Sequence, residues 1–212
     1  MAKGFDAIGY WELRHAELRG DHRNVGNRGL TSDQNAYLIA TKATRVARHL
    51  GTLGHQPEAR VLDAGCGAGA FTRLMAEAGF DMLGVDCSET AIADALTHGI
   101  AEYHVGQLKD FRLGERFPYI LCLDVMFHIV DDIDWRASLA NLAAHLAPGG
   151  RLIVIEYFED YEKKSAAHVR WRNLEAYVQL ARDNALSLLD VQTFHYPGEN
   201  QLKHMLTLEA AP

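Results

Sequence analysis

RVLDAGCGAGAF, residues 60–71, is the most informative segment of this chain. Val61 and Leu62 are an apolar pair typical of a buried strand, and Asp63 follows them directly. The turn after the strand contains three glycines at alternate positions, Gly65, Gly67 and Gly69. Apolar residues at helical spacing come next. The stretch therefore predicts a strand, a tight glycine turn and a helix whose first N–H groups can face a ligand.

A glycine turn alone does not identify the ligand, because dinucleotide enzymes use one too, and Gly65, Gly67 and Ala70 fit G-x-G-x-x-A. Asp63 favours another ligand, since a carboxylate here would repel a pyrophosphate but could hold an ammonium group. LDAGCGAG resembles the signature of class I S-adenosylmethionine-dependent methyltransferases. The resemblance implies that Asp63 and the glycines bind the methionine end of S-adenosyl-L-methionine, with S-adenosylhomocysteine as product.

A second carboxylate stands at the spacing that suits this cofactor. Asp86 ends the next apolar strand, 21 positions after Gly65. A carboxylate about 20 residues beyond the turn can accept hydrogen bonds from both ribose hydroxyls. The alternative is that Asp86 only caps the helix from Ser88 to Thr97; the spacing favours ribose binding. The resemblance adds Cys87 to the cofactor site.

The third strand, residues 101–105, leads to Gln107 and Leu108. In the resembled family an Asp commonly stands at the position of Gln107 and accepts from the adenine amino group, so this chain departs from the pattern. The Gln107 carbonyl is still an acceptor, and Leu108 can pack on the adenine face. We expect both residues to bind the adenine.

Residues 117–124, FPYILCLD, are continuously apolar up to Asp124, as expected for a parallel strand covered on both faces. Ligands of doubly wound sheets bind at the carboxyl ends of strands. The resemblance accordingly places Leu123 and Asp124 at the cofactor. His128 follows closely and is the candidate general base, because histidine titrates near neutral pH. Alternatively, His128 only packs behind the strand.

The acceptor would be held by residues from both ends of the chain. After a helix capped by Asp134 and a Pro-Gly-Gly turn, Glu156 would lie at the active edge of the sheet. If residues 161–173 are helical, His168 and Arg172 share one face; if they are extended, one face carries His168, Arg170 and Arg172. The arginines can pair with a carboxylate or phosphate on the acceptor. Alternatively they are surface charges, or they pair with acidic residues at 159–162.

Residues 7–19 form an irregular amphipathic pattern that predicts a short helix with Ile8, Trp11 and Leu13 among charges. In the resembled family such an N-terminal extension often folds over the cofactor and acceptor as a lid. Tyr10 and Trp11 would then contact the acceptor. Alternatively they are core aromatics.

Composition limits the partners. The 212 residues suffice for one structural unit with a full core. The net charge of −7 provides no positive field for nucleic acid. No run approaches the ~20 apolar residues that span a bilayer, and no signal-peptide core is present. The three cysteines lack metal-ligand spacing. We expect a cytoplasmic monomer or homodimer that acts on a small molecule, without metal, nucleic acid or membrane.

These features predict an α/β, Rossmann-like methyltransferase fold, with a seven-stranded, mostly parallel sheet, an antiparallel last strand and helices on both faces. Residues 1–57 would be the helical lid, and residues 58–212 the cofactor-binding methyltransferase domain. The expected activity is methylation of a small molecule, first of all O-methylation of a hydroxyl on a sugar or secondary metabolite, with an anionic acceptor as one form. N- or C-methylation, a non-catalytic partner subunit and nicotinamide-dependent oxidoreduction are the alternatives.

Overall fold

The computed structural model describes residues 5–158, 163–196 and 201–212, and these form two compact units. The first unit comprises residues 8–106. The second comprises residues 107–212 together with the start of the chain up to Ala7. Each unit carries some of the residues predicted to bind cofactor or acceptor. The predicted role of residues 1–57 as a lid stays a prediction.

Three parallel strands form the sheet of the first unit, in the order β3-β2-β1. They are β1 (Val61–Ala64), β2 (Met82–Asp86) and β3 (Glu102–Val105). β1 is buried along its whole length and β2 is buried up to its last residue, as expected for parallel strands covered on both faces. Ala64 pairs with Val85, so the carboxyl ends of β1 and β2 lie at the same edge.

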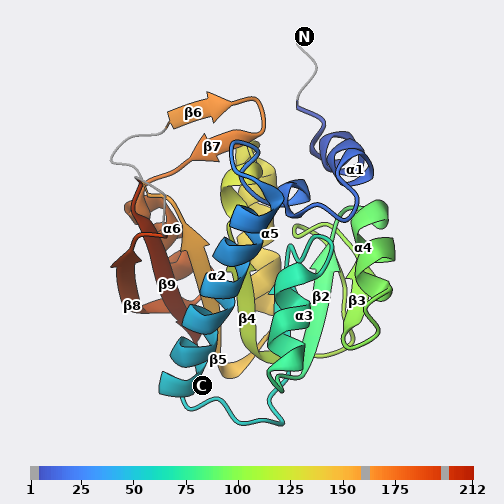
Figure 1. Ribbon diagram of the computed structural model, residues 1–212. Coiled ribbons are helices and arrows are strands. Elements are labelled where there is room, and N and C mark those ends of the chain that lie inside the picture. Colours follow the sequence, from blue (N-terminus) through green and yellow to red (C-terminus); the bar gives the residue numbers. More distant parts are fainter. Residues whose placement is uncertain (1–4, 159–162, 197–200) are drawn as a thin grey trace. The chain divides into compact units, whose positions relative to one another are not determined.

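The helices of the first unit are α1 (Ala7–Glu17), α2 (Ser32–Thr52), α3 (Ala70–Glu77) and α4 (Glu89–Leu96), with a short 3-10 turn, η1 (His22–Asn24). Figure 1 shows α3 alongside β2 and α4 beside β3. Ser88 is the N-cap of α4, and its hydroxyl accepts from the Ala91 N–H. The side chain of Asp86 is therefore not the N-cap of this helix.

The buried face of α1 is polar, which corrects the apolar face expected from the sequence. Leu13 is 66% exposed and Ile8 40% exposed, whereas Arg14 and His15 are buried. Trp11 is half-buried. The helix itself is confirmed, but it turns two ionisable side chains inward.

The second unit has four strands in the order β4-β5-β9-β8. They are β4 (Phe117–Leu123), β5 (Leu146–Glu156), β8 (Leu186–Phe194) and β9 (Lys203–Ala210). β4 and β5 are parallel, and β9 is antiparallel to both β5 and β8. The last strand is therefore antiparallel, as predicted. The Pro-Gly-Gly turn lies inside β5, where the register against β4 shifts, instead of preceding the strand.

The remaining elements of this unit are η2 (Met126–His128), α5 (Asp132–Ala144), α6 (Leu174–Asp183) and the two strands β6 (Lys163–Ala166) and β7 (Val169–Trp171). β6 and β7 pair antiparallel, so the described residues of the cationic segment are extended and not helical. The N-cap of α5 is Asp131, which accepts from the N–H groups of Ile133 and Asp134; the expectation that Asp134 is the cap is wrong.

Candidate functional site

The glycine turn of the first unit is built around Gly67. Its φ of 52° is in the left-handed region, as are those of Gly65 and Gly69. The Gly67 N–H donates to Asp86 Oδ2 at 2.9 Å, and the Ser88 N–H donates to Asp86 Oδ1 at 3.0 Å. These bonds hold the carboxylate at the end of β2 against the turn after β1. The second lone pair of each oxygen can still accept from a ligand hydroxyl.

Asp63 is buried at the end of β1. Thr72 Oγ1 donates to its Oδ2 at 2.6 Å. Burial raises the pKa of Asp63 to about 6, although the Thr72 hydrogen bond and the charge of Lys42 act in the opposite direction. At neutral pH Asp63 is therefore mainly a carboxylate with little water around it, which is the group that would hold an ammonium.

A second set of side chains covers the turn. A Cβ on Gly67 would lie 2.3 Å from Val25 Cγ1 and 3.6 Å from His15 Cε1, so only glycine fits beneath them. Glu12 ties α1 to the start of α4, because its carboxylate accepts from the N–H groups of Glu89 at 2.5 Å and Thr90 at 3.2 Å. Neither His15 nor Val25 was predicted to belong to the site.

The other predicted residues of the first unit lie around this turn and on α1. Burial and the neighbouring Asp86 charge raise the pKa of the Cys87 thiol to about 12, which leaves a neutral thiol. The rings of Tyr10 and Trp11 meet edge to face with centroids 5.2 Å apart, and the Tyr10 hydroxyl accepts from Arg14 at 3.3 Å. Their predicted contact with the acceptor stays a prediction.

Gln107 and Leu108 begin the second unit. The Gln107 carbonyl of the main chain accepts from the N–H groups of Asp110 and Phe111, which closes a tight turn after β3. Leu108 is buried, and Leu123, the last residue of β4, is buried as well. Their contacts with adenine or cofactor stay predictions.

An unpredicted lysine lies at the carboxyl end of β4. Asp124, directly after the strand, has a left-handed φ of 63°, unusual for a residue other than glycine. Its carboxylate forms an ion pair with the ammonium of Lys203 at the start of β9. The Lys203 side chain is 5% exposed, and its ammonium lies 3.7 Å from the centroid of the Tyr157 ring and 5.6 Å from that of Phe127. The buried ammonium is thus paired with a partly exposed carboxylate, as a buried charge requires.

Glu156 lies beside this pair and is fully buried. Its Oε1 accepts from the Met126 N–H at 2.9 Å, and its Oε2 has no hydrogen-bond partner among the described residues. Burial, and then the charge of Asp124, raise the pKa of Glu156 to about 8, while Lys203 lowers it. At pH 7 the side chain is therefore a neutral acid that fixes the first residue of η2.

His128 ends η2 and is half-buried. Its Nδ1 lies 2.9 Å from the main-chain oxygen of His168, and the two imidazole rings stack with centroids 5.4 Å apart. A carbonyl oxygen only accepts, so Nδ1 carries the hydrogen, and the neutral ring has its lone pair on Nε2. This is the tautomer that a base acting through Nε2 needs.

Arg170 and Arg172 converge on one carboxylate. Arg170 Nη1 lies 2.8 Å from Asp132 Oδ2, and Arg172 Nη2 lies 3.0 Å from Asp132 Oδ1. Arg172 is 1% exposed and its guanidinium also stacks over Trp135. Arg172 Nη1 has no hydrogen-bond partner among the described residues. Two cations share one anion, and their predicted role toward an acceptor stays a prediction.

Within residues 5–158, 163–196 and 201–212, no three His, Cys, Asp or Glu side chains gather in a way that could hold a metal ion. Over the same ranges, every helix is too short or too polar to cross a membrane.

A family model described as a methyltransferase domain matches residues 34–207. The chain is 34% identical over 118 residues to the ubiquinone biosynthesis O-methyltransferase of Bradyrhizobium diazoefficiens, covering 53% of this chain and 44% of that protein. It is 28% identical over 179 residues to the glycine N-methyltransferase of Mus musculus, covering 76% and 58%. The chain thus spans about half the length of the curated relatives it matches.

Among solved structures, magnesium protoporphyrin IX methyltransferase from Synechocystis PCC 6803 with bound SAM matches with a TM-score of 0.75, 19% identity and complete coverage of both chains. The N-methyltransferase NodS from Bradyrhizobium japonicum, in complex with S-adenosylhomocysteine, matches with a TM-score of 0.71 and 18% identity over 95% of this chain and 98% of that one. These likenesses confirm the predicted Rossmann-like methyltransferase fold with its seven-stranded, mostly parallel sheet.

Proposed function

Because this chain belongs to the methyltransferase domain family, we propose that it transfers a methyl group from S-adenosyl-L-methionine to a hydroxyl of a small molecule. S-adenosylhomocysteine is the second product. The proposal covers three parts of the chain: the glycine turn that holds the cofactor, the histidine that takes the acceptor proton, and the arginines that orient the acceptor.

The glycine turn has the groups that this cofactor requires. Gly67 lets the main chain pass beneath Val25 and His15, where a Cβ would not fit, and its N–H holds the carboxylate of Asp86. Asp63 is a buried carboxylate suited to the ammonium of the methionine end, and Asp86 is held where it can accept from ribose hydroxyls. When bound, the cofactor supplies a methyl group on a sulfonium, which becomes a neutral thioether on transfer.

His128 is the base in this proposal, and its hydrogen bond to the His168 carbonyl is the observation that carries the choice of a hydroxyl acceptor. That bond fixes Nδ1 as the protonated nitrogen, so Nε2 takes the hydroxyl proton while the acceptor oxygen forms its bond to the methyl carbon. A hydroxyl needs such a base more than a neutral amine does, because an amine attacks with its own lone pair and its proton can leave afterwards.

Buried neighbours keep His128 in place. Glu156 anchors the start of η2 through the Met126 N–H, and Lys203 neutralises Asp124 at the same strand end. Phe127 packs with Val169 and Trp171 of β7 in an apolar cluster. Rigid, dry surroundings suit a displacement in which the protein mainly positions the reactants and excludes water.

The acceptor in this proposal carries a carboxylate or another anionic group. Arg170 and Arg172 both pair with the carboxylate of Asp132, which brings two guanidinium groups to one place. Arg172 also has a guanidinium N–H group that no described residue uses. Both arginines belong to the chain segment that supplies the His168 carbonyl, so the base and the cationic pair are fixed by one hairpin.

The test is S-adenosylhomocysteine release with paired acceptors. A panel of ring hydroxyls, each with and without a carboxylate, is compared with amines of similar size. We expect turnover with the carboxylated hydroxyls. The matched variant is His128→Asn, whose amide can still donate to the His168 carbonyl but offers no base near neutral pH. Its turnover should fall by roughly 10²- to 10⁴-fold.

Cofactor affinity of His128→Asn, measured by calorimetry, should be unchanged. Unchanged turnover in His128→Asn would remove His128 from the role of base. Turnover confined to amine acceptors would replace O-methylation by N-methylation.

A further inference from the structure

The side chain of His15 lies against the glycine turn and has no assigned role. Its Cε1, the carbon between the two ring nitrogens, would be 3.6 Å from a Cβ on Gly67. The N–H of the same glycine donates to Asp86. His15, Gly67 and Asp86 therefore meet at the place where the proposed function puts the ribose of the cofactor.

His15 is 2% exposed, and its Nδ1 has no hydrogen-bond partner among the described residues. A buried polar atom without a partner is unfavourable, so a buried imidazole usually has one. Packing alone does not explain the residue. The nearby Trp11 ring, at a centroid distance of 6.2 Å, would be served equally well by an apolar aromatic side chain.

The chemistry of the ring suits a hydroxyl ligand. Burial lowers the pKa of His15, although the negative charges of Asp86, Glu12 and Asp94 oppose this and that of Arg14 adds to it. The neutral imidazole that results has one nitrogen that donates and one that accepts. A ribose hydroxyl can likewise donate to one group and accept from another. The Asp86 carboxylate can only accept hydrogen bonds, whereas His15 can also donate one, so the two side chains complement each other at a hydroxyl.

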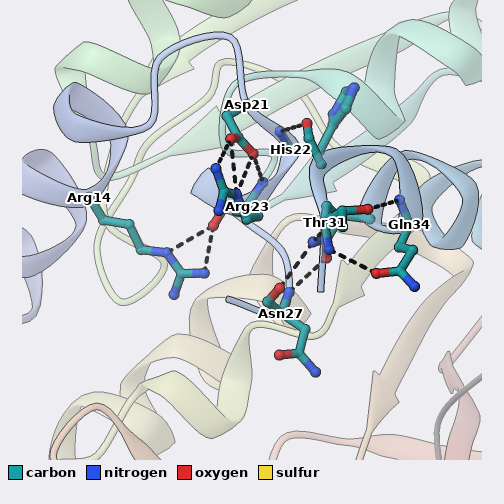
Figure 2. A network of polar contacts seen from close by, with 9 residues as sticks. Arg14, Asp21, His22, Arg23, Asn27, Thr31 and Gln34 are labelled. Carbon is teal, nitrogen blue, oxygen red and sulfur yellow. Dashed lines mark hydrogen bonds and ion pairs between the residues drawn. The ribbon is translucent and has the colours of Figure 1, made fainter. Parts of the chain in front are cut away.

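Arg14, the neighbour of His15 in the sequence, belongs to a network of polar contacts in the loop between α1 and α2 (Figure 2). Arg14 donates from Nη2 to the Arg23 carbonyl at 2.8 Å and also to the Gly26 carbonyl. The side-chain amide of Asn35 accepts from the main-chain N–H of Asn27 at 2.8 Å and donates to the main-chain oxygen of Asn27 at 3.0 Å. This network holds the loop that carries Val25. A preorganised loop loses little conformational entropy when a ligand binds.

The start of α2 completes the network. Thr31 and Gln34 form a capping box, in which the Thr31 hydroxyl accepts from the Gln34 N–H and the Gln34 side chain accepts from the Thr31 N–H (Figure 2). Asp21 accepts from the main chain and the guanidinium of Arg23 within η1. Hydrogen bonds within the loop and to its flanking helices therefore hold the loop between α1 and α2. The side chain of His15 takes part in none of these hydrogen bonds.

We propose that His15 is a cofactor-binding residue of this chain, whose ring nitrogen completes its hydrogen bonding with a ribose hydroxyl of S-adenosyl-L-methionine beside Asp86. The inference rests on the proposed function. It adds a ligand contact from α1, an element outside the glycine turn and the ends of the strands.

Calorimetry with two ligands tests this contact. S-adenosylhomocysteine and 5′-methylthioadenosine share the adenosine, but only the first has the amino-acid end. His15→Phe keeps the ring packing and removes both nitrogens. We expect His15→Phe to lower the affinity for both ligands by a similar factor, roughly 5- to 100-fold, which corresponds to the loss of one buried hydrogen bond. His15→Gln, which retains a donor and an acceptor, should recover part of the affinity.

The outcomes separate the two proposals. If the wild-type chain binds neither ligand, the proposed function fails. If it binds both and His15→Phe binds them equally well, the inference about His15 is overturned. If His15→Phe loses affinity for S-adenosylhomocysteine but not for 5′-methylthioadenosine, His15 lies at the amino-acid end of the cofactor and the ribose assignment is overturned. Should His15→Phe unfold, His15→Leu, which also lacks both nitrogens, takes its place: a folded variant with a similar loss of affinity for both ligands supports the contact, and one with no loss refutes it.

Discussion

Gly67→Ala is the substitution whose cost can be worked out most fully from the structure. The new Cβ would lie 2.3 Å from Val25 Cγ1, far inside van der Waals contact. The loop that carries Val25 is held by Arg14 and Asn35, so Val25 can relieve the contact only by leaving its present rotamer. Overpacking of this kind costs about 1–3 kcal/mol. The left-handed φ of 52° adds about 1–2 kcal/mol for a residue with a Cβ.

The free energy of unfolding should therefore fall by about 2–5 kcal/mol. Urea unfolding measures it, and Gly99→Ala is the matched control. Gly99 has a φ of 67° in open space, so its variant should lose only the conformational part, about 1–2 kcal/mol. Combining Gly67→Ala with Val25→Ala should recover the overpacking part. Equal losses in Gly67→Ala and Gly99→Ala, or no recovery in the double variant, would refute the contact.

Three predictions concern the ionisable groups. Because the pKa of Asp63 is about 6, affinity for S-adenosylhomocysteine should fall as the pH is lowered from 7.5 to 5, and calorimetry of Asp63→Asn should show weak binding without this trend. The pKa of Glu156 is raised to about 8, so the folded chain holds a proton that the unfolded chain loses near pH 4.5. The stabilisation present at low pH is then lost as the pH rises through 8. Urea unfolding should therefore give a lower free energy of unfolding at pH 9 than at pH 6. Glu156→Gln, whose amide oxygen can accept from the Met126 N–H but does not titrate, should not show this difference. Lys203→Met removes the ion pair with Asp124, whose side chain is 19% exposed, and should lower the free energy of unfolding by about 1–3 kcal/mol; an unchanged free energy of unfolding would contradict a stabilising pair.

The sequence predicted the cofactor side of the fold well, because local rules determine it. Residues 60–71 combine a buried strand, a glycine turn and a helix start, each with a short-range signal. Asp86 followed from its distance to that turn, and its bond to the Gly67 N–H agrees with the expected position at the sheet edge. These features depend on neighbours within one strand-turn-helix unit.

Helix ends and strand limits were harder, since several residues offer the same signal. Asp131, Asp132 and Asp134 are all acceptable N-caps, and only the accepted N–H groups identify Asp131. The Pro-Gly-Gly turn appeared to precede a strand, yet the main chain at 148–150 continues β5 with a shift in register. The limits of such a strand depend on which residues pair with the neighbouring strand, and local composition does not reveal that pairing.

The missed residues of the site depend on contacts far apart in the sequence. Lys203 meets Asp124 across 79 positions, and nothing local marks it as more than the first residue of a strand. His15 was overlooked because Leu13 and Ile8 suggested a different buried face of α1. A usable signal existed there: Arg14 and His15 are adjacent ionisable residues on a helix whose apolar residues do not form one stripe.

Calorimetric titration with S-adenosylhomocysteine, with NAD as the comparison ligand, shows which of the two cofactors the glycine turn binds. We expect the wild-type chain to bind S-adenosylhomocysteine and not NAD. Asp86→Ala should weaken that binding by roughly 10- to 100-fold, since it removes a charged hydrogen-bond acceptor. Binding of NAD in place of S-adenosylhomocysteine, or undiminished affinity in Asp86→Ala, would contradict the assignment of the glycine turn and Asp86 to this cofactor.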